Sequence, residues 1–123
     1  MAEAWSTLTH LEFSEKEIEA RYNIPEISQW FIGHFPDFPL LPGIALLGLV
    51  QDVLQRVADH DKKRVTIEEF RRIRFKKIVR PDQDIEIYIK PVDSKETCLY
   101  RFNIKRGEID ISSGDIILRM ESV

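Results

Sequence analysis

The sequence contains one cysteine, few glycines and no long uninterrupted apolar run, and these shortages exclude several classes of protein. A single cysteine, Cys98, cannot form an internal disulfide. The longest apolar stretch, residues 40–50, includes Pro42 and two glycines and is too short to span a bilayer. The net charge of −3 provides no general attraction to nucleic acid or anionic membranes. The first residues lack a basic start followed by an apolar stretch, so we expect no signal peptide and a cytoplasmic location.

The remaining composition is that of an ordinary globular domain. Of the 123 residues, 43% are hydrophobic and 32% are charged, which excludes a disordered or fibrous chain. This length is enough to bury a real core, and no repeat or linker-like segment divides it. We therefore expect a single domain over residues 1–123.

Alternating apolar and polar residues predict antiparallel strands before and after one helix in the chain. Two short strands come first, over residues 8–13 and 16–24, with a turn at Ser14 and Glu15. The strands expected after the helix cover residues 65–79 with a break near Glu68 and Glu69, 84–92, 98–106, and 108–120 with a kink or bulge at Ser113 and Gly114. Turns are expected at residues 93–96 and at Arg106 and Gly107.

Pro42 and Gly43 are typical of a helix start, and the helix is expected to run from Ile44 to about Asp59. Its first two turns are apolar all round, which predicts a helix buried on most sides. A curled antiparallel sheet must then wrap around it. This is an α+β arrangement, the hot-dog fold, with the sheet around one long central helix.

The segment GHFPDFPLLPG, residues 33–43, resembles the signature of the β-hydroxyacyl-acyl-carrier-protein dehydratases, G-H-F-P-x-x-P-apolar-apolar-P-G. The stretch FRRIRFKKIVRPDQDIEI is similar to a second segment of that family. The resemblance implies removal of water from a (3R)-3-hydroxyacyl thioester to give a trans-2-enoyl thioester. It also implies a substrate carried on acyl carrier protein or coenzyme A, with no cofactor beyond the carrier's pantetheine arm. The family's active site lies at a dimer interface, so we expect a homodimer, with a trimer of dimers left open.

The resemblance assigns roles to individual residues. His34 is the base that takes the C2 proton, and an imidazole titrates in the range that this task needs. The N–H of Gly43 polarises the thioester carbonyl, and a helix N-terminus has unpaired donors suited to that purpose. The residues expected to line the acyl site are Phe35, Phe38, Leu41 and Gly48.

The sequence departs from the family at its acidic residue. The acid is expected fourteen positions after His34, where this chain has Gly48. The next carboxylate on the helix is Asp52, one turn further on and on the same side. Asp52 is either the replacement acid or a structural partner of Arg56 at the i+4 spacing. Asp52→Asn should then lower turnover about a hundredfold in the first case and little in the second.

Three functional hypotheses follow from this departure. The chain is a dehydratase that uses His34 with Asp52 or water, or an acyl thioester hydrolase on the same fold. Alternatively it is a non-catalytic, acyl-thioester-binding subunit of a hetero-oligomer, in which another chain supplies the acid.

A run of basic residues stands out in this acidic chain: Arg71, Arg72, Arg74, Lys76 and Lys77. In a strand, Arg72, Arg74 and Lys76 would share one face. The run is either a docking surface for an acidic acyl carrier protein or a solvated edge strand protected by charge. Nucleic-acid binding would need a basic net charge, and no metal-ligand spacing is evident along the chain, so we expect neither.

Overall fold

The structure is a computed structural model that describes residues 6–24, 43–77, 79, 83–92 and 98–122. In chain order the elements are β1 (Thr7–Phe13), β2 (Ile18–Ile24), α1 (Gly43–His60), β3 (Lys63–Phe75), β4 (Gln83–Pro91), β5 (Leu99–Arg106) and β6 (Ile109–Ser122). The predicted order of two strands, one helix and four further strands is confirmed. The turns at Ser14 and at Gly107 are also where the sequence places them, while residues 93–96 lie outside the described residues.

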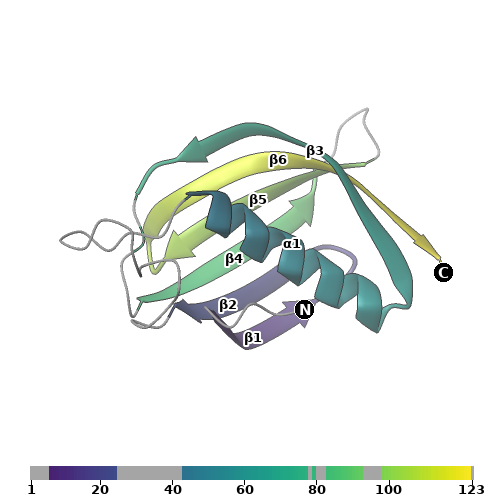
Figure 1. Cartoon of the computed structure of the whole chain (residues 1–123), viewed down its shortest axis with the longest axis horizontal. Coiled ribbons are helices and arrows are strands. Elements are labelled where there is room, and N and C mark those ends of the chain that lie inside the picture. The colour runs from purple at the N-terminus through teal and green to yellow at the C-terminus, as the bar shows by residue number, and fades with distance from the viewer. Residues whose placement is uncertain (1–5, 25–42, 78, 80–82, 93–97, 123) are drawn as a thin grey trace.

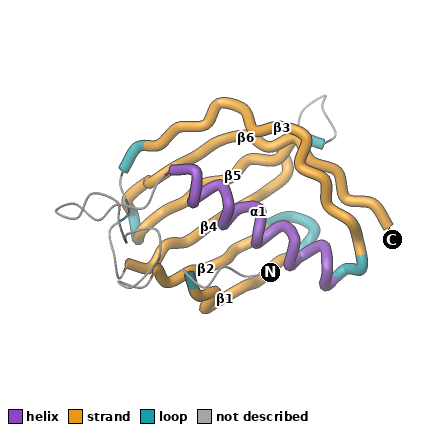
Figure 2. Tube along the Cα trace, in the orientation of Figure 1, coloured by secondary structure: helices purple, strands orange, loops and turns teal. Residues whose placement is uncertain are grey.

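The strands form one antiparallel sheet in the order β1-β2-β4-β5-β6-β3, so β1 and β3 are its edges. The sheet curls, and α1 lies across its inner face (Figure 1; Figure 2). The alternation in β4 turns Ile85, Ile87 and Ile89 toward α1, and all three are fully buried. The hot-dog prediction is confirmed, because one long helix packs on one face of a curled antiparallel sheet.

The helix buries one face rather than its whole circumference. The buried positions repeat at helical spacing: Ala45, Leu46, Leu49, Val50, Val53, Leu54, Val57 and Ala58. On the other side, Ile44 is 65% exposed and Gly48 is exposed. Within the described residues, the expectation that the helix is covered on most sides is therefore wrong, because the sheet curls over only one face of it.

The break predicted near Glu68 is present as a β-bulge in β3. Ile67 pairs with Leu118 while Glu69 pairs with Ile117, so Glu68 is an extra residue in the ladder. Such a bulge bends the strand and helps an edge strand follow a curled sheet.

The kink or bulge predicted at Ser113 and Gly114 is present in the ladder with β3, where Arg72 and Ile73 both lie opposite Gly114. In the ladder with β5 the two residues pair in unbroken register, and the extra residue of β6 is Ile111. Gly114 is also required for packing, since a Cβ there would lie 2.7 Å from the ring of Phe102. The glycine therefore indicates close approach of a side chain, which a sequence pattern does not distinguish from a bulge.

Candidate active site

Three residues of the candidate site lie on α1, within the part of the chain that the structure describes: Gly43, Gly48 and Asp52. Four of the predicted site residues lie outside the described residues: His34, Phe35, Phe38 and Leu41. Their roles stay predictions from the sequence.

Gly43 is the first residue of α1, where a backbone N–H has no acceptor within the helix. The ring of Phe75, at the end of β3, lies directly beside it. A Cβ on Gly43 would be 2.9 Å from Cε1 and Cζ of Phe75, so a side chain here would displace the ring. Glycine thus keeps the start of the helix close to β3, with its donors and the positive end of the helix dipole in place.

Phe75 is a residue of this site that sequence reasoning did not single out. Its ring is unusual among large apolar side chains of the described residues because it is 53% exposed. The only sequence signal is that Phe75 belongs to the second segment with family resemblance, which attaches no role to it. Its position next to Gly43 comes from the pairing of β3 with β6 and not from local sequence.

Gly48 occupies the helical position where the family's acid is expected. It is exposed, and a Cβ built there would meet no described atom within 4 Å. The space beside it could therefore accept a larger side chain without rearrangement of the described residues. A glycine inside an exposed helical turn costs about 1 kcal/mol relative to alanine, and the described contacts do not offset this cost.

Asp52 lies one turn beyond Gly48, and its carboxylate has two partners within the chain. The hydroxyl of Tyr22 donates to Asp52 Oδ2 at 2.5 Å, and Nε of Arg56 donates to the same oxygen at 2.8 Å. The Asp52 side chain is 19% exposed, and Tyr22 is 1% exposed. The predicted pairing with Arg56 is confirmed, while a catalytic role for Asp52 stays a prediction.

The contact between Tyr22 and Asp52 joins β2 to α1. Alternation in β2 turns Tyr22 inward toward the helix, with its hydroxyl at the carboxylate. Burial, and then the adjacent Asp52 carboxylate, raise the pKa of the Tyr22 hydroxyl well above its ordinary value. The hydrogen bond from Arg56 to Asp52 raises the pKa of the guanidinium. Tyr22 therefore remains a neutral donor and Arg56 remains charged, so both can donate to Asp52.

We expect Asp52→Ala to destabilise the fold more than Tyr22→Phe. Without the carboxylate, the buried Tyr22 hydroxyl loses its acceptor, at a cost of about 1–3 kcal/mol. Tyr22→Phe removes the donor itself and leaves the pair of Asp52 with Arg56, so its expected cost is about 1 kcal/mol. Urea unfolding of both variants and of the double variant measures this, and equal costs for the two single variants would contradict it.

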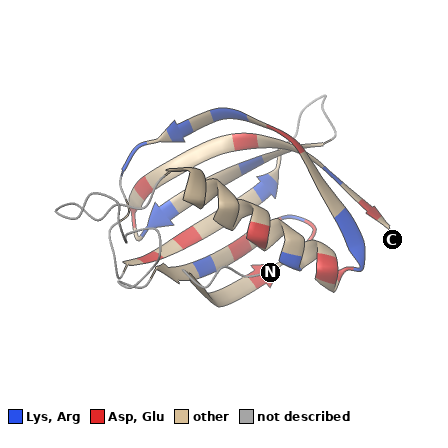
Figure 3. Cartoon of the chain, in the orientation of Figure 1, with Lys and Arg blue, Asp and Glu red and all other residues tan. Residues whose placement is uncertain are grey.

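The basic run lies at the end of the edge strand β3 and just beyond it (Figure 3). Arg71 is half-buried and donates to Glu69 at 2.9 Å. The exposed members are Arg72, Arg74, Lys76 and Lys77. A second bulge lies between Arg71 and Arg74, where Arg72 has a φ of 53°. The alternation expected for Arg72, Arg74 and Lys76 is therefore interrupted. The first three basic residues do lie on an edge strand, while the choice between a docking surface and a charged edge stays open.

Comparison with known proteins shows the family to which this hot-dog chain belongs. The family described as ApeI-like, ApeI dehydratase, matches residues 10–115. The chain therefore belongs to the ApeI-like dehydratase family. No helix of the described residues is long and apolar enough to cross a membrane.

Curated relatives include the 3-hydroxyacyl-(acyl-carrier-protein) dehydratases FabZ of Streptococcus suis and Petrotoga mobilis. The first is 34% identical over 91 residues, which cover 71% of this chain and 65% of the relative. The second is 34% identical over 87 residues, covering 65% of this chain and 63% of the relative. The chain thus spans slightly less than two thirds of the length of these relatives.

Among solved structures, the dehydratase heterocomplex ApeI:P from Xenorhabdus doucetiae matches with a TM-score of 0.75 and 24% identity, over 91% of this chain and 96% of that one. A hypothetical thioesterase from Streptococcus pneumoniae with coenzyme A matches with a TM-score of 0.67 and 10% identity, over 96% and 88%. At these identities the structural likeness shows the fold alone.

Proposed function

We propose that this chain removes water from a 3-hydroxyacyl thioester to give a trans-2-enoyl thioester during acyl-chain synthesis. The observation that carries the proposal is the start of α1 at Gly43, the last residue of the segment GHFPDFPLLPG. Membership of a dehydratase family supports the reaction class, and the names of the FabZ relatives support a carrier-linked substrate.

In the proposed reaction, His34 takes a proton from C2 of the substrate. The electron pair of that C–H bond forms the C2–C3 double bond, and the C3–O bond breaks. The departing hydroxyl takes a proton from an acid and leaves as water. The Gly43 N–H donates to the thioester oxygen as negative charge develops there, which stabilises the transition state.

The reverse reaction offers a direct test. Hydration of a short trans-2-enoyl thioester, linked to coenzyme A and then to acyl carrier protein, removes its ultraviolet absorbance. We expect turnover with the carrier-linked substrate, and release of free thiol would instead indicate the thioesterase hypothesis. Absence of hydration with both substrates would contradict the proposal for the chain acting alone.

The open position at Gly48 leads to a gain-of-function prediction. We expect Gly48→Glu to raise hydration at least tenfold, because it restores a carboxylate where the described structure leaves space for one. Gly48→Gln is the matched control, since it has the same size and lacks the acid. Both variants should gain about 0.5–1 kcal/mol in unfolding free energy from helix propensity. An equal rate for Glu and Gln would show that a missing acid does not limit this enzyme.

A second candidate function is a subunit that supplies His34 and Gly43 while a partner supplies the acid. The absence of a carboxylate at the exposed Gly48 favours it, as does the engagement of Asp52 with Tyr22 and Arg56. The exposed side chains of Ile44 and Phe75 are suited to contact with another chain, a second copy or a related subunit. The ApeI structure named above is a heterocomplex. Under this hypothesis the chain alone is inactive and Gly48→Glu restores activity.

The exposed basic residues after the Arg72 bulge are proposed to dock an acidic acyl carrier protein. We expect Arg74→Glu combined with Lys77→Glu to raise KM about tenfold or more for carrier-linked substrate at low salt. The same variant should leave KM for the coenzyme A thioester within about twofold. Lys63→Glu with Arg64→Glu, exposed at the other end of β3, is the matched control. A similar loss in the control would contradict a defined docking surface.

A further inference from the structure

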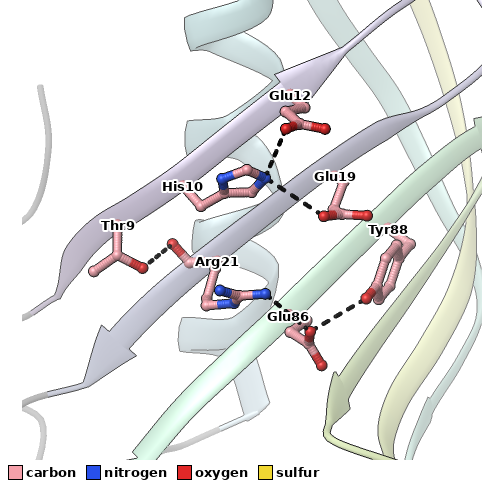
Figure 4. Close-up of polar contacts among 7 residues, drawn as sticks. All are labelled: Thr9, His10, Glu12, Glu19, Arg21, Glu86 and Tyr88. Carbon is pink, nitrogen blue, oxygen red and sulfur yellow. Dashed lines mark hydrogen bonds and ion pairs between the residues drawn. The ribbon is translucent and has the colours of Figure 1, made fainter.

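A histidine and two glutamates meet on the outer face of the sheet, on the opposite side from the helix. His10 Nε2 lies 3.5 Å from Glu12 Oε1 and 3.5 Å from Glu19 Oε2 (Figure 4). Ligand atoms of the three side chains all lie within 4.8 Å of one another. Spacing along the chain does not reveal this group, because Glu19 comes from β2 while the other two belong to β1.

A β-bulge makes this arrangement possible. Leu8 pairs with Tyr22 while His10 pairs with Arg21, so Thr9 is the extra residue of β1. Leu8 and Leu11 both pack against the core, and the bulge reconciles their odd spacing. His10 thereby shares the outer face with Glu12. The Thr9 hydroxyl donates to the carbonyl of Arg21 at 3.2 Å, which ties the bulge to β2.

The pairing of β1 with β2 places two carboxylates directly opposite each other, Glu12 and Glu19. Like charges at directly opposed positions destabilise an antiparallel pair unless a counter-charge lies between them. The guanidinium of Arg21 is directed to Glu86, at 3.5 Å, whereas the His10 ring lies next to both carboxylates (Figure 4). Burial, then the carboxylates of Glu86 and Glu19, raise the pKa of the nearby Tyr88 hydroxyl, as expected for a negative local field.

From this geometry we infer that His10, Glu12 and Glu19 form a binding site for Zn²⁺. The distance of 3.5 Å from the imidazole nitrogen to each carboxylate is too long for a good hydrogen bond. It is close to the separation of about 3.4 Å between two ligands of a tetrahedral zinc ion with bonds of 2.0–2.1 Å. One neutral imidazole and two carboxylates balance the charge of the ion, and the mixed N and O ligands favour zinc over magnesium or calcium. The site is independent of the proposed dehydration.

The three side chains are accessible to the ion from solvent. The exposed fractions are 32% for His10, 74% for Glu12 and 40% for Glu19. Three protein ligands leave a fourth position for water or for a ligand from another molecule. A partly exposed site with three ligands is expected to bind zinc in the micromolar range, well below the affinity of a closed four-ligand site.

Calorimetric titration of the metal-free full chain with Zn²⁺ at about pH 7.5 tests the site. We expect His10→Gln and Glu19→Gln each to weaken binding at least tenfold. His60→Gln is the matched control, because His60 is 72% exposed and contacts one carboxylate, Asp61, at 3.2 Å. The affinity of His60→Gln for Zn²⁺ should remain within about twofold of that of wild type. Unchanged binding in His10→Gln, or an equal loss in His60→Gln, would overturn the assignment.

A second measurement compares the Tm of Glu19→Gln with that of wild type, and the difference is expected to change sign when Zn²⁺ is added. Without metal, Glu19→Gln should raise Tm relative to wild type, because it removes one of two opposed carboxylates. With saturating Zn²⁺ the same variant should have the lower Tm, because wild type gains stability from the bound ion. The same sign in both conditions would overturn the inference, and the metal-free transition verifies that the variant folds.

Discussion

His34→Ala is expected to abolish hydration of a trans-2-enoyl thioester while leaving the chain folded. A general base contributes about 10²- to 10⁴-fold to a rate, and in the proposed reaction no other group takes the C2 proton. The histidine lies within a segment of three prolines, Pro36, Pro39 and Pro42, whose fixed φ angles restrict the backbone around it. Loss of turnover should therefore come from the missing imidazole.

The measurement is the decrease in ultraviolet absorbance of the enoyl thioester, with unfolding followed in parallel by circular dichroism. His60→Ala is the matched control, since His60 is the exposed last residue of α1 and lies outside the segment GHFPDFPLLPG. It should retain wild-type turnover. If His34→Ala kept more than a tenth of the wild-type rate, His34 could not be the base, and the proposed mechanism would fail even though the hydration activity remained.

Gly43→Pro is expected to lower kcat about 10²- to 10³-fold, the usual effect of removing one oxyanion donor. Proline is tolerated at the first helical position, because the N–H that it lacks has no intrahelical acceptor there. The substitution therefore removes the donor while leaving the helix start intact. A larger side chain would meet the ring of Phe75, so the experiment is made in a Phe75→Ala background.

Gly43→Ala in the same Phe75→Ala background is the matched control. Alanine also adds a Cβ, but it keeps the backbone N–H. We expect the proline variant to be slower than the alanine variant by the full 10²- to 10³-fold, with similar Tm values. Equal rates would exclude the Gly43 N–H from the reaction and leave only a packing role for this glycine.

Elements that depend on local sequence were predictable. Alternation in β4 and helical spacing in α1 reflect which side chains must leave water, and they need no knowledge of the rest of the chain. The pair of Asp52 with Arg56 is equally local, because residues four apart are neighbours on any helix. The break predicted near Glu68 and Glu69 follows from the two adjacent polar residues in the strand, and the structure shows it as a bulge.

Contacts that depend on strand register were not predictable. The partner of Asp52 on the sheet, Tyr22, is thirty residues away in sequence and reaches the helix only because β2 lies beneath it. A kink or bulge was predicted at Ser113 and Gly114, but only the structure reveals that the extra residue there belongs to β3 and that the ring of Phe102 lies close to the glycine. Phe75 lies beside Gly43 through the pairing of β3 with β6.

The sequence by itself determined the class of fold, the family and the position of the helix start at Gly43. These follow from hydrophobic periodicity and from a proline-rich segment whose residues are adjacent in the chain. Only the tertiary structure decided the surroundings of the side chains. It showed that a Cβ at Gly48 would meet no described atom within 4 Å, that Asp52 is held by Tyr22 and Arg56, and that His10 meets Glu19 across two strands. The physical reason is that sheet register and bulges determine which distant residues meet, and both are set by packing of the whole domain.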